Sequence, residues 1–310
     1  MLRAGWSLVW RRQRLLWWVY LLSLVLGFFA TQPLVSMIGP VLDQSLAADR
    51  LYHGFDLATF GELLMRPEVA PETVGMAALF FMIIFLVLML LLTGGILKVY
   101  NEDRTFATGE FFSAGGEYFW RFVRLTILLL IVLLPVALLN RGVKAWSDSL
   151  SDRLAQPAPG VAVRLVGALV VLLLLMAVRL WFDVAEIHAV AEGEYAVRRA
   201  LARAWRLTRA NFGSLFWIYF RLSLLTWLGT AVVFWVWVRF VSHHAIGVSL
   251  VLSQAVIFWW ILTRLWQRSS ETLWYQQHTA APIAEPQPYF PAALEAPPGG
   301  REAPPPEVSL

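Results

Sequence analysis

The sequence contains no cysteine. Disulfide bonds, thiolate metal sites and cysteine nucleophiles are therefore excluded. Charged residues are also scarce, at 15% of the 310 residues, whereas soluble domains contain about 25%. Hydrophobic residues make up 59%, and the mean hydropathy is +0.63. This balance excludes an ordinary soluble protein and indicates a membrane protein.

Recognisable catalytic motifs are missing as well. The chain has no HExxH zinc motif, no Walker A phosphate loop, no GxSxG nucleophile elbow and no GxGxxG dinucleotide turn. The adjacent His243 and His244 point in different directions and have no acidic neighbour, so they do not predict a metal site. The apolar segments lack acidic residues, which argues against ion-coupled transport. We expect no catalytic residue, cofactor or metal, and a protein that is not an enzyme.

Six apolar segments are long enough to cross a membrane. About 20 apolar residues in a helix span a hydrocarbon core about 30 Å thick, and residues 75–97 contain no charge at all. The sequence therefore predicts an all-α polytopic bundle of six transmembrane helices within residues 1–278. The expected spans are about 15–37, 75–97, 120–140, 161–182, 214–238 and 245–265.

Two segments outside these spans have a clear composition. Residues 279–310 contain nine of the sixteen prolines and few large aliphatic residues, which predicts a disordered, proline-rich cytoplasmic tail. In the first outer loop, Asp56 is placed to cap a short helix over residues 56–64 that rests on the outer membrane surface.

Lysine and arginine are concentrated on one side of the expected membrane. Eighteen lie on the side of both termini and seven on the other. Because basic residues favour the cytoplasmic side, we expect both termini to be cytoplasmic. Five basic residues near the inner ends of the spans are expected to act as interfacial anchors: Lys98, Arg124, Arg179, Arg221 and Arg264.

The inner ends of the helices share a pattern that suggests three hairpins, at about 1–100, 101–182 and 205–268. The helices returning to the inner side end in a basic, an aliphatic and an aromatic residue, as in Arg179-Leu180-Trp181. The positive-inside rule and the aromatic belt are an alternative explanation for the same pattern.

Acidic residues follow one of these inner ends. Arg179 and Asp183 are four residues apart, so we expect them to form an ion pair on one helix face. His188 lies close to Asp183 and Glu186, and we interpret this group as a solvated helix end rather than a metal centre.

The connection at residues 194–210 predicts an amphipathic helix at the cytoplasmic surface. It contains neither glycine nor proline, and its apolar residues recur every three or four positions. Its arginines are expected either to bind anionic lipid headgroups or only to fix the topology: Arg198, Arg199, Arg203, Arg206 and Arg209. The connection at 106–120 has an aromatic interface, but Gly109, Gly115 and Gly116 are expected to break it into pieces.

Both connections carry a resemblance to a known group of proteins. The stretches Trp181–Leu225 (WFDVAEIHAVAEGEYAVRRALARAW and onward) and Gly94–Leu125 (GGILKVYNEDRTFATGEFF and onward) resemble uncharacterised bacterial six-helix inner-membrane proteins. These are similar to the membrane domain attached to some glycerophosphodiester phosphodiesterases. The resemblance covers about residues 75–275 and implies an all-helical protein of the bacterial inner membrane. The phosphodiesterase catalytic domain is absent here, so no phosphodiesterase activity is implied.

These observations favour an integral membrane protein without enzymatic activity, acting in envelope or lipid organisation or as a partner subunit. The expected partners are anionic membrane lipids and a further membrane protein, with no nucleic acid, because the arginines lie beside membrane spans. The alternative is a permease for an amphiphilic small molecule or lipid. A more distant alternative is an intramembrane enzyme, which needs acids and histidines at one depth.

Overall fold

The computed structural model describes residues 1–43, 71–102, 107–154, 157–241 and 246–279. These residues form α-helices joined by short turns, and no β-strand occurs among them. The helices are α1 (Leu2–Arg11), α2 (Gln13–Asp43), α5 (Pro71–Asn101), α6 (Thr108–Leu154), α7 (Pro157–Ala191), α8 (Val197–Ala210), α9 (Phe212–Phe240) and α10 (Ile246–Thr279).

Six of these helices are long and apolar enough to cross a membrane: α2, α5, α6, α7, α9 and α10. The predicted fold class, an all-α bundle with six membrane helices, is therefore confirmed. The helices extend well beyond the expected spans. With 47 residues, α6 is about 70 Å long at a rise of 1.5 Å per residue, although only residues 120–140 were expected to span.

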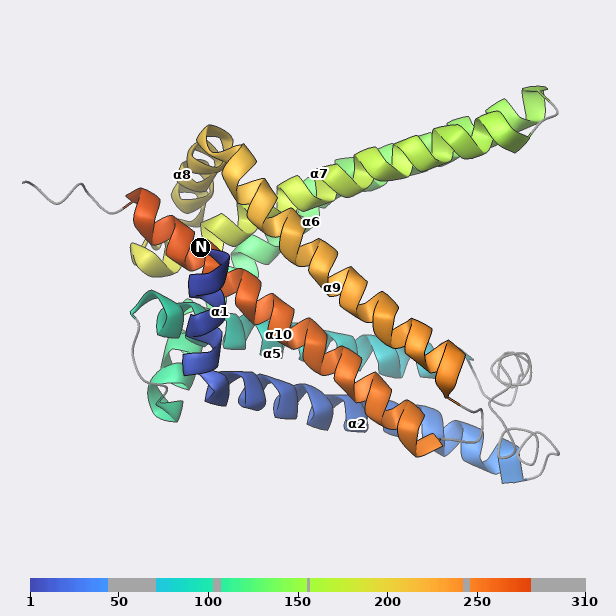
Figure 1. The fold of residues 1–310 in the computed structure, drawn as a ribbon, viewed down its shortest axis with the longest axis horizontal. Coiled ribbons are helices and arrows are strands. Elements are labelled where there is room, and N and C mark those ends of the chain that lie inside the picture. Colours follow the sequence, from blue (N-terminus) through green and yellow to red (C-terminus); the bar gives the residue numbers. More distant parts are fainter. Residues whose placement is uncertain (44–70, 103–106, 155–156, 242–245, 280–310) are drawn as a thin grey trace, which may run out of the picture.

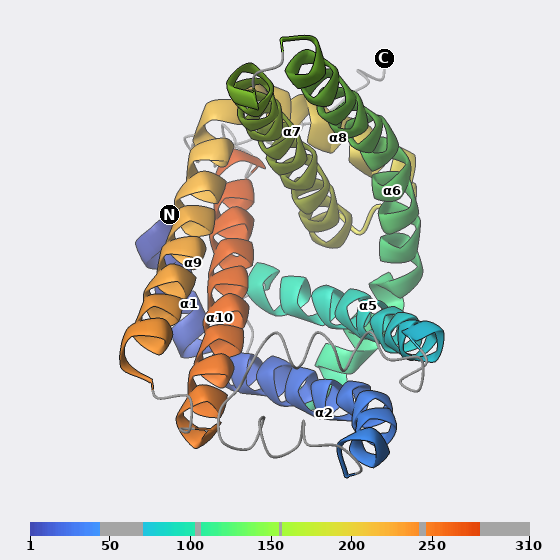
Figure 2. The ribbon, with the colours of Figure 1, turned by 90° about the vertical axis from the view of Figure 1, so that its right-hand side faces the viewer.

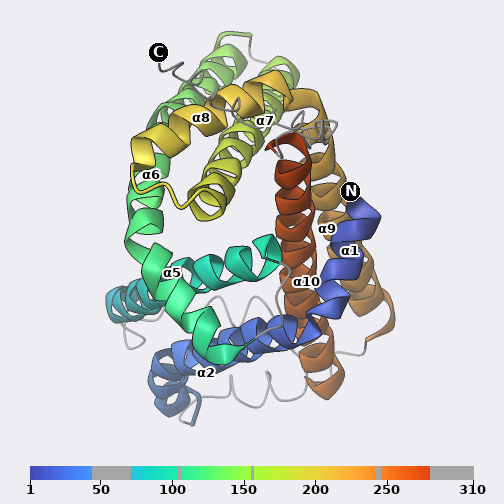
Figure 3. The same ribbon diagram turned by 90° about the vertical axis from the view of Figure 1, so that its left-hand side faces the viewer.

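The long helices are arranged as three antiparallel pairs: α2 with α5, α6 with α7, and α9 with α10. Figure 1 shows that the pairs meet at one end, next to α1 and α8, and diverge towards the other. Figures 2 and 3, which look along the molecule from opposite sides, show the three pairs beside one another. We call the end where they meet the arginine-rich end, because most of the described basic residues lie there.

Tight packing is concentrated at the arginine-rich end. The largest buried cluster includes Phe122 of α6, Leu180 and Phe182 of α7, Leu215 of α9 and Trp274 of α10. In the most apolar windows of the six long helices, by contrast, at most 17% of the residues are buried within the protein. The apolar side chains of these windows are therefore available to lipid tails.

The first helix, α1, is separate from the first membrane helix and was not predicted. The backbone of Arg12 leaves the helical conformation (φ −111°, ψ 33°), and α2 begins immediately afterwards. α1 packs along α10, where Trp266 Nε1 donates to Leu2 O at 2.8 Å and Ser269 Oγ donates to Gly5 O at 3.0 Å. These bonds attach the start of the chain to the last helix.

The expectation that glycines would break residues 106–120 into pieces is wrong. From Thr108 onward these residues form the continuous first part of α6, which packs against the end of α5. A Cβ on Gly115 would lie 2.5 Å from Leu91 O, and one on Gly95 would lie 2.5 Å from the Phe111 ring. These two glycines permit close helix contact, and that packing outweighs the low helix propensity of glycine.

The far ends of α6 and α7 form a closely packed hairpin that extends beyond the expected spans (Figure 1). Ser147 Oγ of α6 donates to Gly160 O of α7 at 2.8 Å. Gly167 of α7 lies directly against Val143 of α6, so that a side chain there would collide with it. These contacts hold the two helices together along the expected connection and into the start of the expected span 161–182.

Three further sequence predictions lie outside the described residues. They are the capped helix at 56–64, the histidine pair at 243–244 and the proline-rich tail from residue 280 onward.

Candidate functional site

A buried carboxylate surrounded by arginines lies where α7 and α10 meet at the arginine-rich end. Asp183 is fully buried and forms ion pairs with three arginines. Its Oδ1 lies 3.1 Å from Arg179 Nε and 3.1 Å from Arg268 Nη2, and its Oδ2 lies 3.4 Å from Arg264 Nη1. The expected ion pair between Arg179 and Asp183 is present, but it is one of three.

Two more carboxylates balance these charges. Glu186 Oε2 lies 2.5 Å from Arg268 Nη2. Glu271 accepts a hydrogen bond from Gln267 Nε2 at 2.8 Å, and Gln267 Oε1 in turn accepts one from Arg264. The cluster therefore holds three arginines and three acids, and it joins α7 to α10. We call it the charge cluster.

Arg264, whose role as an interfacial anchor stays a prediction, also belongs to the charge cluster. Its guanidinium donates to both oxygens of Asp183. The two residues are 81 positions apart, so no helical spacing relates them. The charge cluster exists because α7 and α10 are packed together, which the sequence alone does not show.

The interpretation of His188 as part of a solvated helix end is wrong. His188 is buried, and its Nδ1 lies 2.5 Å from the hydroxyl of Tyr275. That hydroxyl also lies 3.4 Å from Glu192 Oε1 and donates to it. The reason is that α10 continues to Thr279 and covers this part of α7.

The five arginines of 194–210 lie on one separate helix, α8, and all five side chains are exposed. Its opposite face is buried and consists of Val197, Ala200, Ala204 and Thr208. A turn at Gly193, whose φ of +62° favours glycine, separates α8 from α7. Trp181 of α7 donates its Nε1 hydrogen to Leu201 O at 3.0 Å and so attaches α8 to α7.

The other expected anchors lie apart from one another at the arginine-rich end. Lys98 Nζ of α5 lies 3.7 Å from Glu117 Oε2 of α6. Arg124 is exposed. The Arg221 guanidinium lies over the Trp217 ring, 4.6 Å from its centre. Their anchoring role stays a prediction, and the structure does not bring these three residues into one site.

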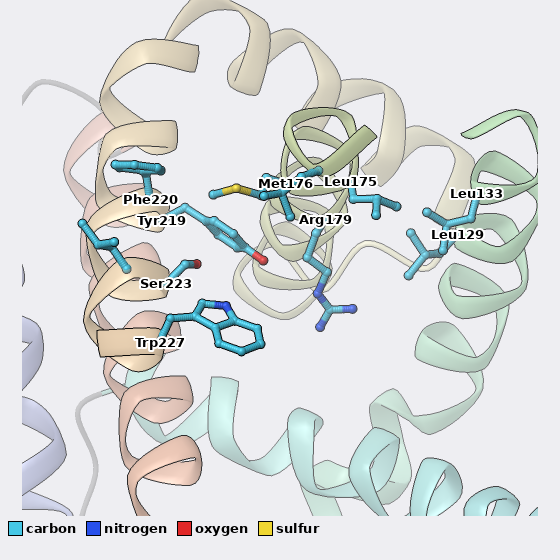
Figure 4. A pocket seen from close by; sticks show the side chains of 11 residues that line it. Leu129, Leu133, Leu175, Met176, Arg179, Tyr219, Phe220, Ser223 and Trp227 are labelled. Carbon is cyan, nitrogen blue, oxygen red and sulfur yellow. The ribbon is translucent and has the colours of Figure 1, made fainter. Parts of the chain in front are cut away.

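A cleft of about 590 Å³ lies between the α6–α7 pair and α9. Figure 4 shows Arg179 of α7 and Tyr219, Ser223 and Trp227 of α9 around the same space. The rest of its lining is mainly apolar and includes Leu129, Leu133, Leu172, Leu175, Met176 and Phe220. A smaller cavity shares Ser223 and Trp227 with it and reaches Arg264. We call the two together the α7–α9 cleft.

No group of three or more histidines and acids within the described ranges is arranged to hold a metal ion.

Comparison of the chain with protein-family models, with curated proteins and with solved structures found no match. The functional argument therefore depends on the geometry of α8, the charge cluster and the α7–α9 cleft.

Proposed function

We propose that this integral membrane protein belongs to the bacterial inner membrane and acts without catalysis, in lipid or envelope organisation, by contacting anionic lipids through α8. The observation that carries the proposal is the row of five exposed arginines on a helix whose other face is fixed against the bundle. The resemblance of residues 181–225 to bacterial six-helix inner-membrane proteins supports the same location.

The arginines of α8 are suited to this role because the helix is amphipathic and its orientation is fixed. Its buried face packs small residues against α7, and Trp205 packs on Trp181 with ring centres 4.8 Å apart. An arginine near an anionic leaflet contributes about 1 kcal/mol. Arg203 contributes less, since it lies 3.6 Å from Glu194 Oε2.

Replacing all five arginines of α8 with glutamine is expected to lower the amount of anionic lipid that co-purifies with the protein. The charges would be lost, while the buried face of α8 would be unchanged. The measurement is the ratio of phosphatidylglycerol and cardiolipin to phosphatidylethanolamine in the purified protein. Replacing the same five residues with lysine keeps the charges and should preserve the ratio. Equal ratios in all three proteins would rule out the proposal.

The orientation of the chain can be tested directly because it contains no cysteine. We introduce a single cysteine at Ala202 on α8. In intact cells, we expect it to react with a membrane-permeant maleimide but not with an impermeant one. A cysteine at Trp146, which is exposed near the far end of α6, should react with an impermeant maleimide. The reverse labelling pattern would place α8 outside the cytoplasm and would contradict the proposal.

A permease for an amphiphilic molecule is the second candidate, and the α7–α9 cleft favours it. The cleft lies between two helix pairs and combines an arginine with apolar walls. Such a permease would move a fluorescent phospholipid between the leaflets of proteoliposomes faster than protein-free vesicles do. Equal rates would remove this candidate without affecting the proposal for α8.

A further inference from the structure

We propose that the α7–α9 cleft binds one anionic phospholipid, with its phosphate at Arg179 and Arg264 and an acyl chain along α6 and α7. This inference rests on the proposed contact with anionic lipids, but it concerns a different surface from α8 and a single, individually bound molecule.

The charge cluster presents mainly positive charge to the cleft. The side chains of Arg179 and Arg264 are 36% and 35% exposed, whereas the carboxylate of Asp183 is fully buried behind them. Glu271 and Arg268 are buried as well. A molecule in the cleft therefore meets two guanidinium groups but not the acids that balance them, which favours an anion.

Hydrogen-bond donors are available beside these arginines. The hydroxyls of Tyr219 and Ser223 and the indole nitrogen of Trp227 line the cleft, and no hydrogen bond joins them to other described residues. Arg179 uses Nε towards Asp183, and its terminal nitrogens form no ion pair within the described part of the chain. Figure 4 shows the Arg179 guanidinium and the Tyr219 hydroxyl directed into the same space. Together these groups can surround a phosphate, which accepts several hydrogen bonds.

The apolar part of the cleft lies on the side towards the membrane interior. Leu172 and Leu175 precede Arg179 on α7, and Leu129 and Leu133 lie further along α6 from the arginine-rich end. Arg179 itself lies near the end of the expected span 161–182, at the depth of lipid headgroups. The larger of the two cavities in the cleft has a volume of about 590 Å³, which is within the range of about 300–1,000 Å³ for ligand sites. A polar end at headgroup depth followed by apolar walls matches a phospholipid better than a soluble anion.

The test is native mass spectrometry of the full chain in detergent, titrated with phosphatidylglycerol or with zwitterionic phosphatidylcholine. We expect the first phosphatidylglycerol to bind more tightly than the later ones. We call this first binding event the tight step, and phosphatidylcholine should lack it. The double variant Tyr219→Phe/Ser223→Ala removes two donors without altering the charge cluster, and it should weaken this step about tenfold or more. Glycerol phosphate, which lacks acyl chains, should not compete at equal concentration.

A second pair of variants tests the apolar wall. Leu133→Trp fills the cleft and should abolish the tight step. Leu134→Trp adds the same side chain at the neighbouring position, where leucine is 61% exposed, and should leave binding unchanged. Equal binding by both variants and the wild type, or equal binding of both lipids, would overturn the inference.

The outcome can be separated from that of the α8 proposal. The α8 glutamine variant should lose weakly retained anionic lipids but keep the single tight phosphatidylglycerol. If the tight step disappears in the α8 variant while Tyr219→Phe/Ser223→Ala keeps it, the lipid site belongs to α8 and the cleft proposal is wrong.

Discussion

Replacing Asp183 with asparagine is expected to lower the free energy of unfolding by about 3–5 kcal/mol, the range found when one partner of a buried ion pair is removed. Asp183 contacts Arg179, Arg264 and Arg268. Without its charge, three arginines would face only two carboxylates. Two carboxylates would not balance three guanidinium groups, so the contact between α7 and α10 would carry an excess positive charge.

The measurement is unfolding of the purified protein in detergent, followed by tryptophan fluorescence. Asp148→Asn is a matched control, because Asp148 is exposed on α6, and it should have little effect. Combining Asp183→Asn with Arg268→Gln removes one charge of each sign, so the double variant should lose less stability than the two single effects added together. Additive effects, or equal stability of Asp183→Asn and Asp148→Asn, would contradict this role.

Replacing Gly115 with alanine is expected to separate α5 from α6 and to cost about 1–3 kcal/mol, as overpacking typically does. The added methyl group would lie 2.5 Å from the carbonyl oxygen of Leu91. A backbone atom cannot rotate away as the end of a flexible side chain can, so the helices themselves must move.

The neighbouring Gly116 provides the control. A Cβ at Gly116 meets no atom within 4 Å, and alanine is the better helix former by about 1 kcal/mol. Gly116→Ala should therefore leave the unfolding midpoint in detergent unchanged or raise it slightly, whereas Gly115→Ala should lower it. A similar midpoint for both variants would show that α5 and α6 are not held together through this contact.

The membrane helices could be predicted from sequence because long apolar runs depend on local composition alone. Residues 75–97 illustrate this: they contain no charge, and the structure has them within α5. The ends of the helices could not be predicted in the same way. α10 continues fourteen residues past the expected end at 265, through Arg268 and Glu271. Arg268 can lie there because it pairs with Asp183 and Glu186 of α7, and Glu271 because it accepts a hydrogen bond from Gln267.

The candidate site was predictable only where it depends on short spacing. Arg179 and Asp183 are one helical turn apart, so their ion pair could be expected. The contact of His188 with Tyr275 joins residues 87 positions apart, and the cleft combines side chains of α6, α7 and α9. One signal was present: Gln267 and Glu271 follow Arg264 at three- and four-residue spacing and give α10 a polar stripe beyond the membrane segment.

The divergence of the helix pairs has a consequence for how the chain tolerates mutation. Leu138, Leu165 and Val238 are each more than 60% exposed, so in the bilayer their neighbours are fluid hydrocarbon rather than fixed side chains. Exchanging leucine, isoleucine and valine at such positions changes hydrophobicity little and disrupts no complementary surface. In a saturation library, most aliphatic exchanges in the helix halves far from the arginine-rich end should therefore leave the amount of folded protein unchanged. The same exchanges around Leu180 and Phe182 should lower it.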